Sequence, residues 1–332
     1  MIWHHSAGDL TFLRIAGYGF LGVDLFFVIS GFLIVTLLLR ERDTHGVISL
    51  KYFYIRRSLR IFPVYYGFIL ALAAFYAFVN TDSEIGRTYL SELPIYLLYL
   101  ANFIPVSFAI VWSLASEEQF YLLWPFLEKF FRKHIFLILI AALCVNQCVN
   151  FFHVEITDWL GVEDSSIFQT TFTPILLGVC LAHLLHEKSS FSLFERIFSL
   201  KHGAALWIVA IVLTCSLSPG DITGLPRLSI QVLMALLVGS VVANEKNSLV
   251  SLLCIRPVAR IGAISYGIYL FHIHGIVVAQ KVIDRFDEQS KLAVFVLAYV
   301  VTVVVAEISY RWYEAPILRL KSRFSIVRQD HA

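Results

Sequence analysis

The feature of this sequence that most constrains its fold is a series of apolar runs, each long enough to cross a lipid bilayer. A helix needs about 20 apolar residues to span the hydrocarbon core. The first complete run begins at Gly19 and reads GFLGVDLFFVISGFLIVTLLLR. Only 15% of the 332 residues are charged, whereas soluble domains carry roughly 25%. The runs are continuous and do not alternate polar with apolar residues, so they predict an all-α, polytopic integral membrane protein.

The distribution of lysine and arginine predicts how the helices are oriented. Cytoplasmic connections carry an excess of these residues, and the basic segment 40–60 is therefore placed in the cytoplasm. Segment 93–111 is predicted to be re-entrant or interfacial, because two prolines interrupt it and the charge pattern requires an odd number of crossings nearby. The chain is predicted to make nine crossings, or ten with a restored first helix. After the first run, the crossings are expected near 61–79, 112–128, 135–153, 168–186, 204–219, 227–243, 263–283 and 291–313.

The predicted domain organisation is simple. We expect one membrane domain over 1–318, followed by a basic cytoplasmic tail over 319–332 that is too short to fold alone. Polar residues follow Met1 almost at once, and we expect that most of a first helix is missing from this sequence. The net charge of +2 gives no indication of nucleic-acid binding.

Three arginines follow the first crossing: Arg56, Arg57 and Arg60. Arg57 and Arg60 are spaced i and i+3, so they share one face of a helix. Guanidinium groups hold phosphates through paired hydrogen bonds, and the pair therefore suits a phosphate or pyrophosphate on the cytoplasmic side. The alternative is that these arginines only set the orientation of the helix.

Carboxylates occur inside two of the apolar segments. Asp24 lies near the start of the first crossing, and a carboxylate in a spanning helix is costly and usually functional. Glu117 and Glu118 open the helix expected in WSLASEEQFYLLWP. One of the two can interact with the helix dipole. We expect the other to point into the bundle, with an arginine or a histidine as its partner.

Histidines supply candidate bases. His4 and His5 stand next to each other near the start of the sequence, and histidine is readily poised as a general base near neutral pH. The alternative is that both are merely exposed. Tyr266, Tyr269 and His272 recur at i, i+3 and i+6 and form a polar stripe on one helix, which interhelical hydrogen bonding would also explain. The sequence contains no zinc-binding pattern, nucleophile elbow or phosphate-binding loop, and no metal is expected.

Five segments carry a family resemblance: GVDLFFVISGFLI (22–34), RRSLRIFPVYY (56–66), WSLASEEQFYLLWP (112–125), SYGIYLFH (265–272) and YEAP (313–316). In this order they resemble the membrane acyltransferase-3 family of bacterial O-acyltransferases. The resemblance implies a ten-helix bundle that moves an acyl group, usually acetyl from acetyl-CoA, to a hydroxyl of a carbohydrate or similar acceptor. It also implies a bacterial cytoplasmic (inner) membrane protein, and the basic tail places its C-terminus in the cytoplasm.

The resemblance also assigns roles to residues. It implies that His4, or His5 in an alternative register, removes the acceptor's proton. It implies that Arg57 and Arg60 hold the phosphates of acyl-CoA, and that Glu117 either orients the histidine or pairs with an arginine. Residues expected to assist them are Arg56 on the donor side, and Asp24, Ser30, Tyr269 and His272 around the reacting groups.

Other functions remain open at this point. The intramembrane charges would also suit a transporter or flippase of a polar or anionic substrate, and a non-catalytic partner protein is a third reading. An acyl-enzyme intermediate on a histidine or serine is an alternative to direct transfer. The acceptor could be a polysaccharide, a peptidoglycan sugar, a lipid-linked glycan or a small metabolite, and the sequence predicts no oligomeric state.

Overall fold

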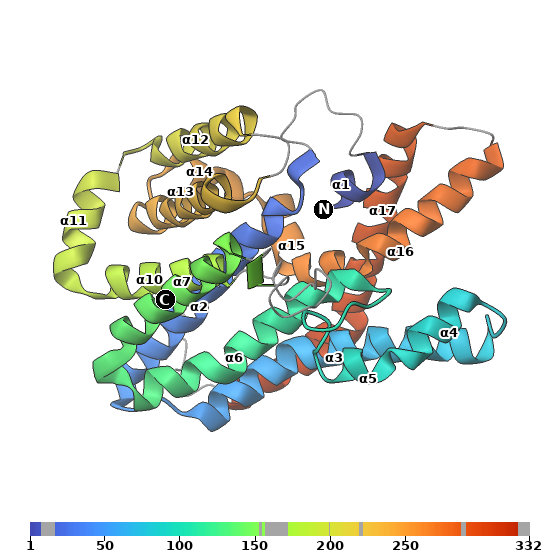
Figure 1. Cartoon of the computed structure of the whole chain (residues 1–332), viewed down its shortest axis with the longest axis horizontal. Coiled ribbons are helices and arrows are strands. Elements are labelled where there is room, and N and C mark those ends of the chain that lie inside the picture. The colour runs from blue at the N-terminus through green and yellow to red at the C-terminus, as the bar shows by residue number, and fades with distance from the viewer. Residues whose placement is uncertain are drawn as a thin grey trace. The chain divides into compact units, whose positions relative to one another are not determined.

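The computed structural model describes residues 1–7, 17–152, 155–156, 172–198, 200–218, 222–286 and 290–324. Within these ranges every regular element is helical, which confirms the predicted all-α class (Figure 1). Six of the described helices are long and apolar enough to cross a membrane: Leu21–His45, Leu50–Phe78, Arg132–Phe151, Gly224–Ala243, Ser265–Phe286 and Lys291–Lys321. Shorter apolar helices occupy Thr173–His186 and Gly203–Leu217. The total of nine or ten crossings stays a prediction.

The chain divides into two compact units, each built from two stretches of sequence. The first unit comprises residues 1–36 and 173–310, and the second comprises residues 37–172 and 311–332. One long helix, α2 (Leu21–His45), begins in the first unit and ends in the second. The expected domain over 1–318 therefore contains two clusters of contacts.

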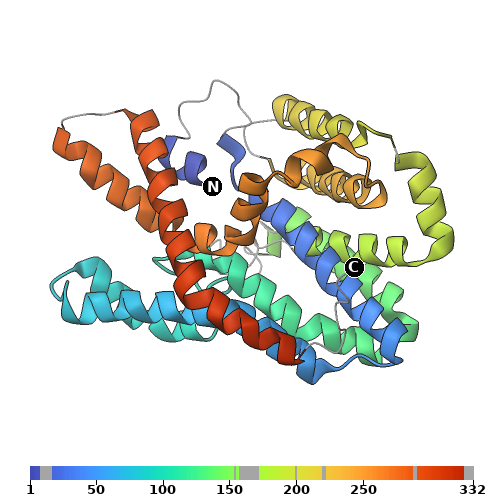
Figure 2. The same cartoon turned by 180° about the vertical axis from the view of Figure 1, so that it is seen from behind.

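The first unit contains α1 and the later spanning helices. Their bounds are α1 (Ile2–Ala7), α10 (Thr173–His186), α11 (Lys188–Phe198), α12 (Gly203–Leu217), α13 (Gly224–Ala243), α14 (Ser248–Leu253), α15 (Arg256–Ala263), α16 (Ser265–Ile283) and α17 (Lys291–Ser309). Within this unit, α12 and α13 lie side by side when seen from the front and from behind (Figure 1 and Figure 2).

Glycines allow α2 and α10 to touch through their backbones. A Cβ atom on Gly31 would collide with the carbonyl oxygen of Ile175, and one on Gly178 would collide with the carbonyl oxygen of Val28. Small residues at helix contacts are typical of membrane bundles, because lipid supplies no hydrophobic force that would drive the helices together. This contact fixes the register between α10 and the half of α2 that carries Asp24.

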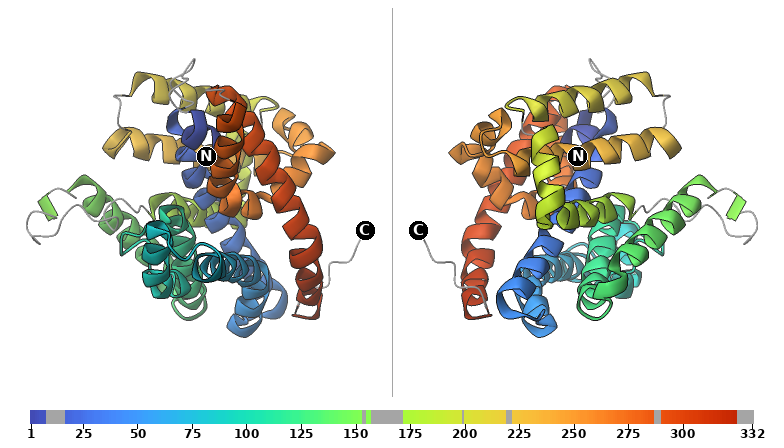
Figure 3. Two further views of the ribbon diagram at one scale, coloured as in Figure 1. Left: turned by 90° about the vertical axis from the view of Figure 1, so that its right-hand side faces the viewer. Right: turned by 90° about the vertical axis from the view of Figure 1, so that its left-hand side faces the viewer.

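The pair α16 and α17 is built in the same way. A Cβ atom on Gly275 would collide with the hydroxyl of Thr302, and one on Gly267 would lie 3.3 Å from the Cβ of Ala306. The two helices lie side by side in every view (Figure 1 and Figure 3). Close packing therefore holds the SYGIYLFH segment of α16 against α17.

The second unit begins with the end of α2 and closes with the end of the chain. Its helices are α3 (Leu50–Phe78), α4 (Glu84–Ser91), α5 (Leu93–Leu97), α6 (Trp112–Phe130), α7 (Ile135–Phe151), the π-helical turn Tyr310–Glu314, α18 (Ala315–Leu318) and the 3-10 segment η6 (Arg319–Phe324). Segment 93–111 contains only the short helix α5 and a 3-10 turn, and its re-entrant or interfacial placement stays a prediction.

Hydrogen bonds to Glu92 order this irregular segment. Its carboxylate accepts from the backbone N–H of Ser107 at 2.9 Å, from the Ser107 hydroxyl at 2.6 Å and from the Tyr96 hydroxyl at 2.6 Å. Burial by itself raises the pKa of Glu92, but these hydrogen bonds outweigh burial and hold the pKa below its ordinary value. The charged form of Glu92 therefore stabilises the connection between α5 and α6.

Candidate functional site

An ion pair links the basic helix α3 to the start of α6. The Arg57 guanidinium donates to Oε1 of Glu117 at 3.0 Å, and the Glu117 side chain is only 2% exposed. The Tyr121 hydroxyl donates to the same carboxylate oxygen. The guanidinium carbon of Arg57 lies 3.7 Å from the centre of the Tyr121 ring, which adds a cation–π contact. Glu117 therefore points inward with an arginine partner, as the sequence predicts.

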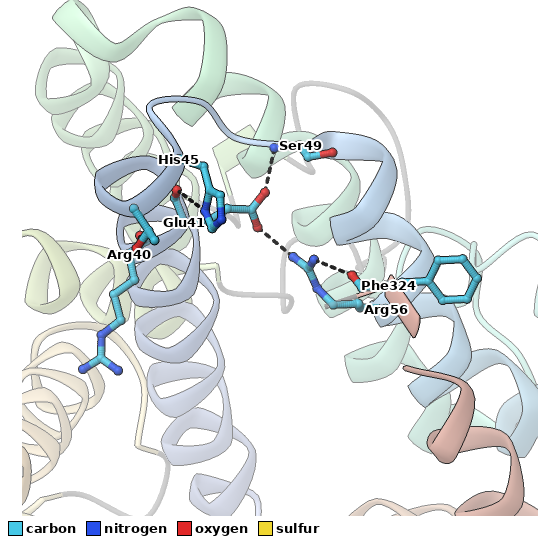
Figure 4. Close-up of polar contacts among 7 residues, drawn as sticks. Arg40, Glu41, His45, Ser49, Arg56 and Phe324 are labelled. Atoms are coloured by element: carbon cyan, nitrogen blue, oxygen red, sulfur yellow. Dashed lines mark hydrogen bonds and ion pairs between the residues drawn. The ribbon is translucent and has the colours of Figure 1, made fainter. Parts of the chain in front are cut away.

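Arg56 is anchored by a different carboxylate. Glu41, near the end of α2, accepts from Arg56 at 2.8 Å and from the backbone N–H of Ser49 at 2.8 Å (Figure 4). The same guanidinium donates to the carbonyl oxygen of Phe324 at 3.1 Å. Arg56 thus joins the end of α2, the start of α3 and the C-terminal segment.

Arg60 differs from the other two arginines of α3. It is exposed, and within the described ranges no carboxylate pairs with it. Two of the three predicted phosphate-binding arginines are therefore engaged by carboxylates, and Arg60 keeps its full charge. The sequence predicts the shared face of Arg57 and Arg60, but it gives no sign that Arg57 is already neutralised.

The carboxylate of Asp24 lies in a polar cluster inside the first unit. Asp24 is fully buried, and its two oxygens accept from Arg227 at 3.2 Å each. Gln231 donates to Asp24 at 3.1 Å from one turn further along α13. A paired and hydrogen-bonded carboxylate is the form in which a buried charge is tolerated. The structure therefore gives Asp24 a definite partner in Arg227.

Hydrogen bonding selects the tautomer of neutral His4. Its Nδ1 lies 2.7 Å from the carbonyl oxygen of Gly17. A carbonyl oxygen only accepts hydrogen bonds, so Nδ1 carries a proton, and in the neutral ring the lone pair is on Nε2. The lone pair on Nε2 is the feature that a general base requires.

His5 and His272 approach each other from different helices of the first unit. Their ring centres lie 5.4 Å apart, and His5 lies 5.0 Å from His4. His272 is fully buried, and its Nδ1 lies 2.5 Å from the carbonyl oxygen of Tyr269. Its buried Nε2 has no hydrogen-bond partner within the described residues. Three predicted histidines, two from α1 and one from α16, therefore form one row.

Ser30 and Tyr269 are the two remaining residues that were predicted to assist the reacting groups. Ser30 is buried on α2, next to the glycine that contacts α10, and Tyr269 is half-buried one turn before His272 on α16. Among the described residues, no three histidine, cysteine, aspartate or glutamate side chains cluster in a way that would hold a metal ion.

Sequence reasoning missed four residues that complete these contacts: Glu41, Tyr121, Arg227 and Gln231. For Tyr121, the spacing of four residues from Glu117 on one helix is a usable signal. For Arg227 and Gln231, the signal is a second charge within an apolar segment, followed by an amide four residues later. Their pairing with Asp24 crosses more than 200 positions of sequence, with |i−j| of 203 and 207.

Comparison with known proteins gives a consistent picture. A family model described as an acyltransferase domain matches residues 1–311. The peptidoglycan O-acetyltransferase OatA of Listeria monocytogenes is 27% identical over 90% of this chain and 51% of its own length. The O-acetyltransferase OatA of Staphylococcus aureus is 29% identical over 90% of this chain and 52% of its own length. The chain thus spans about half the length of these relatives. No solved structure matches it.

Proposed function

The chain belongs to the acyltransferase-3 family, and we propose that it transfers an acetyl group from cytoplasmic acetyl-CoA to a hydroxyl of a cell-envelope carbohydrate. The names of the relatives support an O-linked acetyl group and, for the Listeria protein, peptidoglycan as the acceptor. The observation that carries the proposal is His4, whose protonated Nδ1 leaves the Nε2 lone pair available as a base.

The donor would be held by the basic face of α3. Acetyl-CoA carries phosphate groups, and guanidinium groups bind phosphates through paired hydrogen bonds. Arg60 is the cation of α3 that no described carboxylate neutralises. We place this face in the cytoplasm, with the C-terminus, because the surrounding connections are basic.

The chemistry would proceed by direct transfer. His4 removes the proton of the acceptor hydroxyl as its oxygen attacks the thioester carbonyl. The carbon–sulfur bond then breaks, and the coenzyme A thiolate leaves with the electron pair and takes a proton. General-base assistance of this kind contributes roughly 10²- to 10⁴-fold to the rate. His272, with an unpartnered Nε2 close to His5, is suited to receive or return a proton along the histidine row.

The deciding experiment measures thiol release from acetyl-CoA by the purified chain, with and without peptidoglycan fragments as acceptor. We expect release that depends on the acceptor, and a transporter or flippase would release none. His4→Ala should lower the rate by roughly 10²-fold or more. Near-normal turnover in His4→Ala would remove the base assignment and leave His5 as the candidate. Mass spectrometry of envelope glycans with and without the gene would identify the acceptor by the loss of acetyl groups.

A further inference from the structure

The segment that follows the last long helix is docked on α3. The carbonyl oxygen of Phe324 accepts a hydrogen bond from Arg56 at 3.1 Å (Figure 4). One turn before α18, the Tyr313 hydroxyl donates to the carbonyl oxygen of Pro63 at 3.0 Å. The ring of Tyr313 also packs on Gly67, where a Cβ atom would lie 3.1 Å from its hydroxyl oxygen. Residues 313–324 therefore run along the basic helix in a defined position, and the described part of the predicted tail is not free.

This docking adds a fourth cation to the basic face of α3. Lys321, on η6, is half-buried. Because η6 packs against α3, and its Phe324 carbonyl accepts from Arg56, Lys321 lies beside the helix that carries Arg56, Arg57 and Arg60. Like charges that are held together repel one another, and partial burial strengthens the repulsion because less water screens it. A fold that gathers four cations in this way calls for negative charge among them.

Carboxylates within the described ranges form ion pairs with two of these four cations. Glu41 pairs with Arg56 at 2.8 Å and Glu117 pairs with Arg57 at 3.0 Å. Within the described ranges, neither Arg60 nor Lys321 has a carboxylate partner. The cluster therefore carries two uncompensated positive charges, one on a guanidinium and one on an ammonium group.

We propose that Lys321 and Arg60 together bind a phosphate group of the acyl-CoA donor. This inference rests on the proposed function. A phosphate offers several acceptor oxygens, which match the planar donors of a guanidinium and the point charge of an ammonium group. The two carboxylate-paired arginines hold the site in place, Arg56 by anchoring the C-terminal segment and Arg57 by fixing α3 to α6. The C-terminal segment is thereby part of the donor site.

The test compares the whole chain in nanodiscs of neutral lipid with two variants. Lys321→Gln removes the ammonium group that is proposed to bind the phosphate. Lys51→Gln is the control, and it removes an exposed lysine from the start of α3. The probes are coenzyme A, for binding, and acetyl-pantetheine, a donor without the nucleotide phosphates, for turnover. Charge-assisted hydrogen bonds are worth enough that Lys321→Gln should weaken coenzyme A binding roughly tenfold or more. Turnover of acetyl-pantetheine should stay at the wild-type level, and Lys321→Arg should restore binding.

Three results would overturn the inference. If Lys321→Gln binds coenzyme A as tightly as Lys51→Gln while wild-type turnover of acetyl-CoA is normal, the proposed function stands and Lys321 has no part in it. If Lys321→Gln leaves coenzyme A binding unchanged but lowers the amount of phosphatidylglycerol that copurifies with the chain, the phosphate belongs to a lipid headgroup. If the wild-type chain neither binds coenzyme A nor releases thiol from acetyl-CoA, the proposed donor fails, and this inference fails with it.

Discussion

Removing the carboxylate of Glu117 should destabilise the second unit far more than removing its whole ion pair. The structure leaves Arg57 with 17% of its side chain exposed and gives it Glu117 as a carboxylate partner at 3.0 Å. Breaking such a pair on one side typically costs about 3–5 kcal/mol, because the remaining charge stays buried and uncompensated. Water reaches part of Arg57, so Glu117→Leu should lie near the lower end, at about 3 kcal/mol. The hydroxyl of Tyr121 loses its acceptor as well, which adds about 1 kcal/mol.

The measurement is a double-mutant cycle of unfolding free energies in mixed micelles. Arg57→Met should cost less than Glu117→Leu, and the double variant should recover about 2 kcal/mol or more of the summed losses, because a buried ion pair can be replaced by apolar residues at little cost. Glu84→Gln, which changes an exposed carboxylate on α4, serves as the control and should stay within about 0.5 kcal/mol of the wild type.

Additive losses would refute this account. If the coupling energy between Arg57 and Glu117 falls below about 0.5 kcal/mol, the two groups act independently. Glu117 would then need another explanation for its burial, such as a direct part in the reaction. Acetyl transfer measured on the same variants separates the two cases, since a purely structural pair should leave the turnover of the folded fraction unchanged.

Three further outcomes follow from described contacts. Gly178→Ala should destabilise the first unit by roughly 1–3 kcal/mol, because its methyl group meets the carbonyl oxygen of Val28, and a wild-type unfolding midpoint would show that the helices part easily. Glu92→Gln should destabilise most above pH 5, because hydrogen bonds hold the folded pKa of Glu92 below its ordinary value of 4.5. The stabilisation is present above that value and is lost as pH falls through the folded pKa, so a difference that grows in acid would contradict it. Asp24→Asn should lower the free energy of unfolding by roughly 3 kcal/mol or more, because Arg227 loses its carboxylate partner. Adding Arg227→Gln should recover part of this loss, and unfolding measurements on the single and double variants would detect it.

Patterns confined to one helix or one segment were predictable from the sequence. The length and continuity of the apolar runs predict helices, and the prolines at 94 and 105 predict the irregular segment between α5 and α6. The sequence predicted that one of Glu117 and Glu118 points inward, but the helix dipole does not account for the other, because α6 begins at Trp112 and has no acidic residue in its first turn. Polar residues in apolar surroundings single out His5 and His272 in the sequence. The sequence does not predict that their rings lie next to each other.

Contacts between distant segments were not predictable, because they depend on how helices pack. Arg227 contacts Asp24 because the start of α2 and α13 belong to one unit. The positions of the two residues in the sequence do not predict this contact. The docking of Phe324 on Arg56 is of the same kind, with |i−j| of 268. Positive charge at the end of a membrane protein ordinarily indicates orientation alone, so nothing in the sequence indicates that Phe324, in the described part of the predicted tail, contacts Arg56.

The hydrogen bond between His4 and Gly17 also bears on the design of inhibitors and labels. Only one nitrogen of the His4 ring has a lone pair, so an electrophile that reaches this imidazole should form its bond at Nε2 and leave Nδ1 bound to the backbone. A peptide digest would show which of the two nitrogens carries the adduct. A compound that presents an electrophilic carbon in place of the acceptor's hydroxyl would then act as a covalent blocker of this position.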